Sequence, residues 1–357
     1  MMKTKPSGQT IVSAQDLNEF CVKILMRSSG MPLADARTVT DNLIFANLRG
    51  TDTHGITRLG VYLELLEAGV ATVQHNVQII KDTQSTALVD ADNALGQIGA
   101  QFGMELAIQR ARQHGIGWVL VGNSGHIGAL AYWAMMALQH DMVGICFTST
   151  ASIMAAHGSR ENTLGNNPLS IAAPSSGPMP LVLDMALSVA ARGHLAVAKR
   201  ENKSIPPGWA MDAEGVPTTD PAKGLEGSVL PIGGYKGSGL SMMLEALTGI
   251  LSGSPFGTQK GSLVPPDCTK PLGLSHAFVA LKIDNYIPVP AFKKRMDALI
   301  DEIKNSAPSR DIHEVLVPND KEFRIEQERK KNGIPLSPTL IKELKSFSDK
   351  YDIPFPT

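Results

Sequence analysis

The fold class of this chain is indicated most directly by residues 117–128, which read GWVLVGNSGHIG. Gly117–Val121 is a short apolar run of the kind that forms buried strands. A glycine-containing turn follows, and Ala129–His140 then has the apolar spacing of a helix. Strand, turn and helix in this order are the repeating unit of an α/β sheet.

The alternation continues on both sides of this unit. Further buried strands are predicted at Val77–Ile80, Ala87–Val89, Val143–Phe147, Leu181–Leu183 and Ala277–Ile283, and further helices at Ala100–His114, Val189–Arg200 and Gly237–Ser252. Lys203–Pro231 is rich in Pro, Gly and Asp and is predicted to be a long ordered loop, and a Gly/Pro loop is expected to end near Pro271. We therefore predict an α/β domain over residues 76–285, built on a mixed sheet that is at least partly parallel.

Both ends of the chain are predicted to be helical. Ser13 can cap a first helix with Asp16 three positions on, and Gly30 can close it. Pro32 opens a second helix, and Ile56–Ala68 is predicted to be a third. Helices are also expected at Pro290–Asn305 and Pro338–Asp349. We expect residues 1–75 and 286–357 to pack together as a helical layer beside the α/β domain.

Composition and charge narrow the class of protein. Of 357 residues 43% are hydrophobic and 19% charged, which suits a globular core. The formal net charge of -1 argues against a nucleic-acid binder that works by neutralising phosphates. Cys21, Cys146 and Cys268 are odd in number and widely spaced, which favours a reducing compartment and excludes a disulfide framework. Met1–Gln9 lacks the apolar core of a secretory signal, so a cytoplasmic protein without membrane or nucleic-acid partners is expected.

The segment Thr53–Tyr62 carries the first candidate site. If Gly55 onward is helical, His54, Arg58 and Tyr62 lie on one face at intervals of four residues. Arg58 could then hold a carboxylate while His54 moves a proton, because an imidazole titrates near neutral pH. The alternative is the start of a surface helix with a solvated histidine.

The turn at residues 122–128 is the second candidate. Its glycines are spaced three and three, so the G-x-G-x-x-G fingerprint of a Rossmann fold is absent. A strand-to-helix junction still offers free N–H groups to an anion. His126 is a second candidate acid, base or cofactor contact. An ordinary turn, with His126 buried against a backbone carbonyl, is the alternative.

Two further segments suit a nucleotide. Gly233–Gly239 lacks the spacing of a P-loop, but Lys236 ahead of a helix would suit a phosphate or carboxylate. Asp184 ends a strand and could bind a ribose hydroxyl or orient a base, unless Asp184 or Ser188 caps the next helix. The other histidines are expected on the surface or in loops: His75, His114, His140, His157, His276 and His313. Without an HExxH or Cys/His cluster, no catalytic metal is expected.

Together these segments resemble the malate/L-lactate dehydrogenase family. This family contains sulfolactate, ureidoglycolate and diketogulonate enzymes and cyclic imino-acid reductases, and it is unrelated to the Rossmann lactate dehydrogenases. The matching motifs, in order between Val12 and Pro338, are THGITRL at 53–59, GHIG at 125–128, GNNP at 165–168, LDMA at 183–186, ARG at 191–193, IPPGWA at 205–210, PTTDP at 217–221 and GYKG at 234–237.

The resemblance implies an unusual NAD(P)-binding fold and a homodimer with its active site near the subunit interface. It implies His54, beside Thr53, as proton donor and acceptor, although some relatives assign the base to the His126 position. Arg58 and Tyr62 would hold the substrate carboxylate and its polar neighbours. The implied cofactor contacts, for NAD or NADP, are His126, Ile127, Gly128, Asp184, Met185, Ala186, Lys236 and Gly237.

Three departures from the family pattern are visible. Asn166 stands where Thr is common, and His194 follows Arg192 and Gly193 where Lys is usual; Asn166 and Arg192 are expected on the substrate side. Residues 317–320, VPND, replace a Pro-Gly-Glu cofactor contact, so the corresponding contacts would be Pro318, Asn319 and Asp320.

The expected activity is reversible hydride transfer between a nicotinamide and a small 2-hydroxy acid, which yields a 2-oxo acid. An NAD(P)H-dependent reductase of cyclic or N-alkyl imino acids is an alternative, because the same fold and proton donor could serve it. A non-catalytic ligand-binding protein on this fold is the second alternative.

Overall fold

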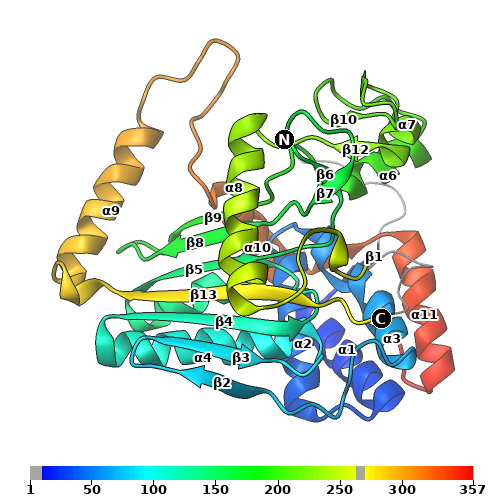
Figure 1. Cartoon of the computed structure of the whole chain (residues 1–357), viewed down its shortest axis with the longest axis horizontal. Coiled ribbons are helices and arrows are strands. Elements are labelled where there is room, and N and C mark those ends of the chain that lie inside the picture. Colours follow the sequence, from blue (N-terminus) through cyan, green and yellow to red (C-terminus); the bar gives the residue numbers. More distant parts are fainter. Residues whose placement is uncertain (1–9, 263–269, 357) are drawn as a thin grey trace.

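The computed structural model describes residues 10–262 and 270–356. Met1–Gln9 and Cys268, which entered the expectations on targeting and cysteines, lie outside the described residues. The centre of the molecule is a seven-stranded sheet with strand order β2-β3-β4-β13-β5-β8-β9 (Figure 1). Its strands are β2 (Gln78–Asp82), β3 (Thr86–Asp90), β4 (Ile116–Ser124), β5 (Met142–Thr148), β8 (Leu169–Ala173), β9 (Leu181–Met185) and β13 (Leu274–Lys282).

The expectation of a partly parallel sheet is confirmed for one pair of strands. β3 and β4 are parallel and are joined through α4 (Gly96–His114), whereas the other pairs in this sheet are antiparallel. β4 and β5 do run in the same direction, but β13 lies between them and pairs antiparallel with both. A strand from late in the chain therefore turns a parallel arrangement into a mixed one.

Helices cover both faces of this sheet. α4 and α5 (Leu130–Met136) pack on one face around Met104, Trp133 and Phe278. On the other face lies α8 (Tyr235–Glu245), which continues as a π-helical turn, η4 (Ala246–Ile250). Leu120 and Ala277 of the sheet contact Leu244 of α8. The period of two along β13 is visible here, since Ala277 and Phe278 face opposite layers.

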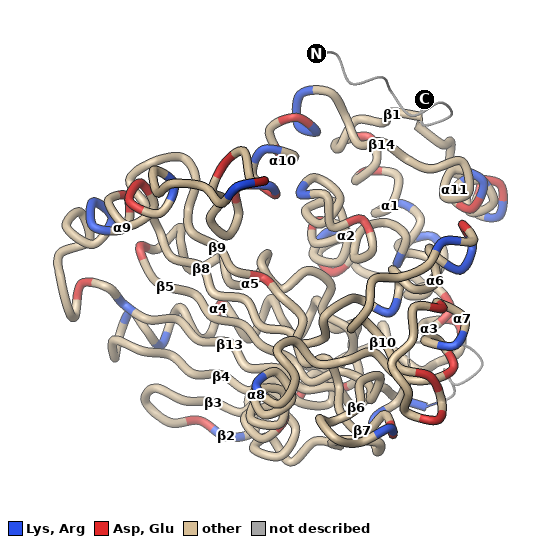
Figure 2. The backbone as a smooth tube through the Cα atoms, turned by 90° about the horizontal axis from the view of Figure 1, so that it is seen from above, with Lys and Arg blue, Asp and Glu red and all other residues tan. Residues whose placement is uncertain are grey.

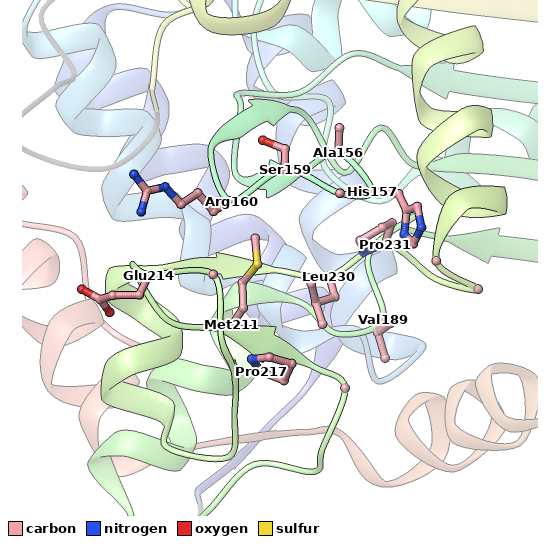
Figure 3. Close-up of a pocket in the computed structure, with 15 residues that line it drawn as sticks. Ala156, His157, Ser159, Arg160, Val189, Met211, Glu214, Pro217, Leu230 and Pro231 are labelled. Atoms are coloured by element: carbon pink, nitrogen blue, oxygen red, sulfur yellow. The ribbon is translucent and has the colours of Figure 1, made fainter.

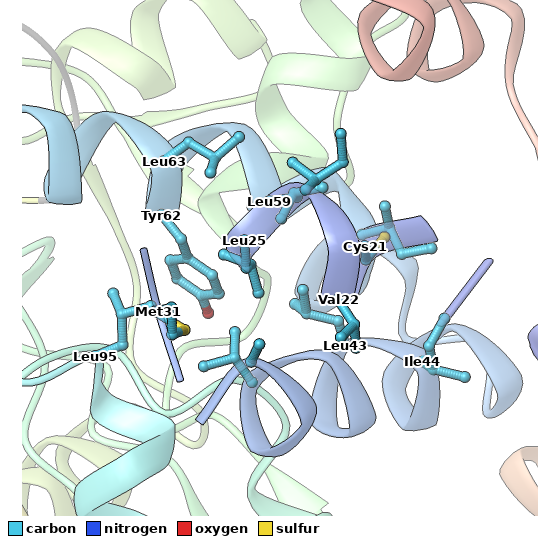
Figure 4. Close-up of a cluster of buried hydrophobic side chains, with 14 of the residues drawn as sticks. Cys21, Val22, Leu25, Met31, Leu43, Ile44, Leu59, Tyr62, Leu63 and Leu95 are labelled. Atoms are coloured by element: carbon cyan, nitrogen blue, oxygen red, sulfur yellow. The ribbon is translucent and has the colours of Figure 1, made fainter. Parts of the chain in front are cut away.

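Elements from both ends of the chain share a second core (Figure 4). They are β1 (Thr10–Val12), α1 (Ala14–Ser29), α2 (Leu33–Leu48), α3 (Leu59–Glu67), β14 (Ile334–Leu336) and α11 (Pro338–Tyr351). β1 and β14 pair antiparallel and tie the two ends together. The predicted caps of α1 are confirmed: the Ser13 hydroxyl accepts the Asp16 N–H at 3.0 Å, and Gly30 is left-handed with φ 71°.

The region predicted as a long loop is instead part of a small sheet, so that prediction is wrong. Its strand order is β11-β10-β12-β6-β7. The elements are β6 (Met154–Ala155), β7 (Asn162–Leu164), α6 (Arg192–Arg200), β10 (Ala210–Met211), β11 (Pro217–Thr218), α7 (Pro221–Glu226) and β12 (Ser228–Val229). Four of its five strands are only two residues long, so they are too short to show a periodic pattern.

Two other elements differ from expectation. β2 was predicted to be buried, but all of its residues are exposed because it forms the edge of the large sheet. α10 (Asp320–Asn332) was not predicted, because its sequence is mostly charged and has no apolar repeat. α9 (Val289–Lys304) stands at the side of the molecule, at the left of Figure 1. Within the described ranges, every helix is too short or too polar to cross a bilayer.

Candidate active site

The turn that carries His54 is not the start of a regular helix. Asp52–His54 and Ile56–Arg58 form two single 3₁₀ turns, and α3 begins only at Leu59. Between them, the Asn47 carboxamide oxygen accepts the Ile56 N–H at 2.8 Å. A Cβ on Gly55 would lie 2.1 Å from that oxygen, so only glycine fits there. The predicted single helical face of His54, Arg58 and Tyr62 is therefore wrong in detail.

The first two candidate motifs nevertheless meet in space. The His54 and His126 rings stack with centroids 5.4 Å apart and planes at 26°. The Thr53 hydroxyl lies 3.1 Å from His54 Nδ1. Arg58 Nε donates to the Thr53 carbonyl at 2.8 Å, which fixes the guanidinium on the same turn. Two imidazoles and one permanent cation thus share a single site.

Hydrogen bonds determine which nitrogen of His126 carries the proton. The Gly128 N–H donates to His126 Nδ1 at 3.3 Å, so Nδ1 is an acceptor. The Tyr62 hydroxyl, 2.8 Å from the same nitrogen, must then donate to it, and it accepts from Gln97 Nε2 at 2.8 Å. Neutral His126 therefore carries its proton on Nε2, as a hydrogen-bond donor.

Tyr62 lies behind His126 instead of in an open cleft. Its side chain is 1% exposed and packs against Leu25, Met31 and Leu95 (Figure 4). Its hydroxyl is occupied by His126 and Gln97. This differs from the substrate contact that the sequence suggested. Gln97 was not identified from the sequence, where it is one polar residue inside an otherwise ordinary helix.

The electrostatics of the site favour neutral imidazoles. Burial, followed by the charge of Arg58, lowers the pKa of His54 to about 4. Burial, followed by His54 and Arg58, holds the pKa of His126 well below its usual value. Burial also raises the pKa of the Tyr62 phenol to about 12. At neutral pH the site therefore presents two uncharged rings and a guanidinium, a combination that attracts an anion.

His276 was expected on the surface or in a loop, and this is wrong. It is fully buried on β13, with Nδ1 2.6 Å from the Thr148 hydroxyl and Nε2 3.0 Å from the Ser124 hydroxyl. Burial lowers its pKa to about 3. It thus ties the end of β4 to β5, just before the turn that carries His126. Its position inside the apolar run 274–281 was the signal that could have revealed it.

His75 lies in a loop before β2, as expected. It is partly buried, and its Nε2 lies 3.0 Å from the Asp35 carboxylate.

The turn at residues 126–128 presents mostly main-chain atoms to a ligand. Ile127 is buried, and its carbonyl accepts the Trp133 indole N–H at 2.8 Å. Gly128 is left-handed with φ 67°, and a Cβ there would lie 1.8 Å from Asn42 Oδ1. A ligand approaching this turn would therefore meet the His126 ring and main-chain atoms.

Asp184 caps a helix, but not the helix that the sequence suggested. Its carboxylate accepts the Ala131 N–H at 2.8 Å, in the first turn of α5. Part of Asp184 reaches the surface, yet the surrounding atoms desolvate its carboxyl and raise its pKa to about 6. The cap brings the end of β9 beside the segment that follows His126.

The chain after Asp184 leads to the start of α8. Leu187 N–H donates to the Asn166 carbonyl, and the Leu187 carbonyl accepts the Ile232 N–H, both at 2.8 Å. Lys236 then lies exposed in the first turn of α8, and Gly237 is buried. Hydrogen bonds from Asp184 to Ala131 and between Leu187 and Ile232 thus connect the stretches of chain next to segments 126–128, 184–186 and 236–237, which together form one band.

This band fits a dinucleotide by its chemistry. Ser188, two residues after the segment 184–186, has a buried hydroxyl that no described residue hydrogen-bonds. Gly233 and Gly234 have φ of 60° and 63°, which brings bare backbone to the start of α8. A cavity of about 640 Å³ adjoins this point, between residues 156–160 and the segment Leu230–Gly234 (Figure 3). That volume lies in the range of small-molecule sites.

Two of the three predicted cofactor contacts at residues 318–320 are engaged by the protein itself. Asn319 accepts from Arg49 at 2.5 Å and donates to the Pro180 carbonyl at 2.8 Å. Asp320 accepts from Lys304 at 2.6 Å and from the Val317 N–H at 2.9 Å, while Pro318 is exposed. Of this predicted cofactor contact, only the Pro318 side chain lies open to solvent.

The predicted substrate-side residues also have protein partners. Asn166 accepts from the Thr150 hydroxyl at 2.9 Å. Arg192 is partly buried and donates to the Leu225 carbonyl at 2.5 Å, and burial lowers its pKa. Met185 and Ala186 are partly exposed on the band described above.

Known proteins resemble this chain over nearly its whole length. The sequence profile of the malate/L-lactate dehydrogenase family matches residues 12–345. Malate dehydrogenase of Pyrococcus abyssi is 37% identical, over 96% of this chain and 95% of that protein. Ureidoglycolate dehydrogenase (NAD(+)) of Escherichia coli O157:H7 is 31% identical, over 94% of this chain and 95% of that protein.

A solved structure agrees with the sequence comparisons. Sulfolactate dehydrogenase from Methanocaldococcus jannaschii matches with a TM-score of 0.90 at 34% identity, over 96% of this chain and 98% of that one. The resemblance inferred from the motifs is confirmed. The chain belongs to the malate/L-lactate dehydrogenase family, whose members depend on NAD(P), and it is a 2-hydroxy-acid dehydrogenase of that family.

Proposed function

We propose that the substrate is a small 2-hydroxy acid with a second anionic group, of the malate or sulfolactate kind, and that His54 moves its proton. The stack of His54 on His126 beside Arg58 carries this proposal. Relatives named malate and sulfolactate dehydrogenases share such a substrate, since malate carries a second carboxylate and sulfolactate a sulfonate. A guanidinium grips a carboxylate through two parallel hydrogen bonds.

The two imidazoles take different roles because His126 carries a proton on Nε2 that it can donate, whereas His54 can accept one. His126 Nε2–H can donate to the substrate oxygen, and its low pKa keeps it neutral while it does so. His54 is unprotonated at neutral pH and can accept the hydroxyl proton. In the reverse direction His54 returns that proton to the oxygen. A carboxylate bound at Arg58 would offset the charge that lowers the pKa of His54, so substrate itself would improve the proton carrier.

NAD or NADP would lie along the band of residues 126–128, 184–186 and 236–237. There the Asp184 carboxylate could accept from ribose hydroxyls, and the Lys236 ammonium could meet a phosphate. A nicotinamide bound there would supply the hydride-transfer chemistry. The unpaired Ser188 hydroxyl supports a polar ligand here.

The test is a screen of 2-oxo acids, with and without an amine, against NADH and NADPH, followed by the variant His54→Ala. We expect kcat to fall about 10²–10⁴-fold in this variant while cofactor binding, measured by fluorescence, persists. The matched control is His114→Ala, an exposed histidine at the end of α4. Undiminished turnover in His54→Ala would move the role to His126. Reduction that requires the amine would identify an imino-acid reductase.

We also propose a homodimer that covers the outer face of α8 and η4. On these elements and the residues that follow them, large apolar side chains are 43–58% exposed: Leu240, Met242, Met243, Ile250, Leu251 and Phe256. Figure 2 shows few charged residues around α8, whereas α9, α10 and α11 carry many. Soluble monomers rarely leave such a continuous apolar surface exposed. A second copy of this chain is the occupant that the family resemblance favours.

Analytical ultracentrifugation tests the dimer. Wild-type protein should sediment as a dimer, and Met243→Asp should shift it toward monomer, because a buried unpaired carboxylate opposes association. Met26→Asp, at a methionine on α1 that is 38% exposed, is the control and should stay dimeric. A wild-type monomer at micromolar concentration would contradict this proposal.

A further inference from the structure

The turn that carries His54 is held by a residue from the far end of the sequence. Arg329, in the last turn of α10, donates from its two terminal nitrogens to the two Asp52 carboxylate oxygens, at 2.7 and 3.0 Å. It also donates to the Asn47 carbonyl. The Arg329 side chain is 16% exposed and that of Asp52 45%, so the pair is shielded from water on the Arg329 side. Asp52 begins the 3₁₀ turn that ends at His54.

Asn47 fastens the same turn at a second point. Its amide donates to Asp52 Oδ1 at 2.6 Å, and its oxygen accepts the Ile56 N–H beyond His54 at 2.8 Å. The residues before and after His54 are therefore tied to the end of α2 and to α10. Single 3₁₀ turns have poor hydrogen-bond geometry of their own, so such external ties determine where the side chain lies.

A second contact holds α10 against the end of α2. Arg49 donates to Glu326 at 2.9 Å and to Asn319 at 2.5 Å, and Arg49 is only 4% exposed. Glu326 and Arg329 are one helical turn apart and both face the segment between α2 and α3. Removal of the Asp52 contact should thus loosen the His54 turn without releasing α10 itself.

We propose that Arg329 is a positioning residue for proton transfer, acting through Asp52 on His54. This inference rests on the proposed role of His54. Small displacements of a reacting group cost rate far more than they cost binding. A fork-shaped guanidinium holds both carboxylate oxygens, whereas an ammonium provides a single point of attachment.

The experiment measures kcat, the KM of the oxo acid and the cofactor Kd for Arg329→Gln, Arg329→Lys and Asp52→Asn. In Arg329→Gln and Asp52→Asn, kcat should fall about 10- to 100-fold while the cofactor Kd changes less than about twofold. Arg329→Lys should recover part of the loss. The matched control is Arg324→Gln, on the same helix as Arg329. It breaks an exposed pair with Glu314, which lies before α10, and should keep wild-type kcat.

The same substitution in a His54→Ala background separates the two hypotheses. If Arg329 acts through His54, Arg329→Gln should cause no further loss there. An equal fractional loss in both backgrounds, or wild-type kcat in Arg329→Gln, would overturn the positioning role alone. Full turnover in His54→Ala would instead overturn the proposed role of His54, and this inference with it.

Discussion

His126 depends on neighbours that its own sequence motif does not contain. Its Nδ1 accepts from Tyr62 and from the Gly128 N–H, and Tyr62 is in turn held by Gln97. The second ring nitrogen is left with the proton and with the role of donor. A phenol with a pKa near 12 stays protonated throughout the working range, so this arrangement does not change with pH.

Tyr62→Phe tests this arrangement. Loss of the hydroxyl removes the main donor to Nδ1, so part of the His126 population should place its proton there and lose the Nε2 donor. We expect kcat to fall about tenfold with little change in the KM of the oxo acid. The control is Tyr286→Phe, at a tyrosine that is 73% exposed. A rise in KM at unchanged kcat would instead identify Tyr62 as a substrate contact.

Much of the candidate site could be read from residue types, but not its contacts. The proximity of Arg58 to His54 follows from their separation along the chain. The meeting of His54 with His126 does not, because it depends on packing between segments 72 positions apart in the numbering. The family resemblance implied a substrate role for Tyr62, and a regular helix from Gly55 would have placed it on the same face as Arg58. The Asn47 contact replaces that helix with two short turns.

At the scale of elements, α8 is fixed by a buried ion pair. Lys260 lies 2.7 and 2.8 Å from the two Glu245 oxygens, and the Asn167 amide donates to Glu245 at 2.9 Å. The Lys260 side chain is fully buried and that of Glu245 is 7% exposed. This pair connects the GNNP motif, the end of α8 and the loop that follows η4.

Lys260→Met should therefore destabilise the protein by about 3–5 kcal/mol, because it leaves the Glu245 carboxylate buried without its cation. Adding Glu245→Gln should recover part of the loss, since the unpaired charge is then removed. Lys203→Met, which breaks the exposed pair with Glu201, is the control and should leave stability unchanged. Urea denaturation measures all four proteins. If Lys260→Met and Lys203→Met lowered the free energy of unfolding equally, the role of the buried pair would be contradicted.

Helices and strands were predicted correctly where a long amphipathic repeat was present. Prediction failed where contacts with other parts of the chain, not a local repeat, determine the element and its burial. α1 was predicted with both of its caps. α10 has almost no apolar repeat. Arg49, Asp52 and Lys304 form ion pairs with its side chains, so apolar contacts are not all that holds it in place. β2 has the residues of a buried strand but lies at the edge of the sheet.

At the scale of the whole molecule, the sheet order could not be predicted from local patterns. β13 pairs with β4 and β5, although in the sequence the small sheet and α8 lie between them and β13. Its sequence only predicts a buried strand; its place between two others is set by the packing of α4 and α8 on opposite faces. That insertion also buries His276 and so links the fold to acid stability.

Acid should destabilise this protein beginning below pH 6.5. The pKa values of His54, His126 and His276 are lowered in the native state, so the unfolded chain takes up protons near pH 6.5 that the native state takes up only at lower pH. Each such group removes about 1.4 kcal/mol of stability per pH unit below that point. Asp184 acts in the opposite direction below pH 6, because its pKa is raised to about 6.

Urea unfolding at pH 7.5, 6.5 and 5.5 should therefore give a falling free energy, with the steepest loss between 6.5 and 5.5. His276→Gln keeps a hydrogen-bonding side chain but cannot titrate, so its curve should be less steep by about 1.4 kcal/mol per pH unit at the acid end. His114→Gln, at an exposed histidine, should leave the slope as in wild type. A free energy of unfolding that is constant from pH 7.5 to 5.5 would mean that these imidazoles have the same pKa in the native state as in the unfolded chain.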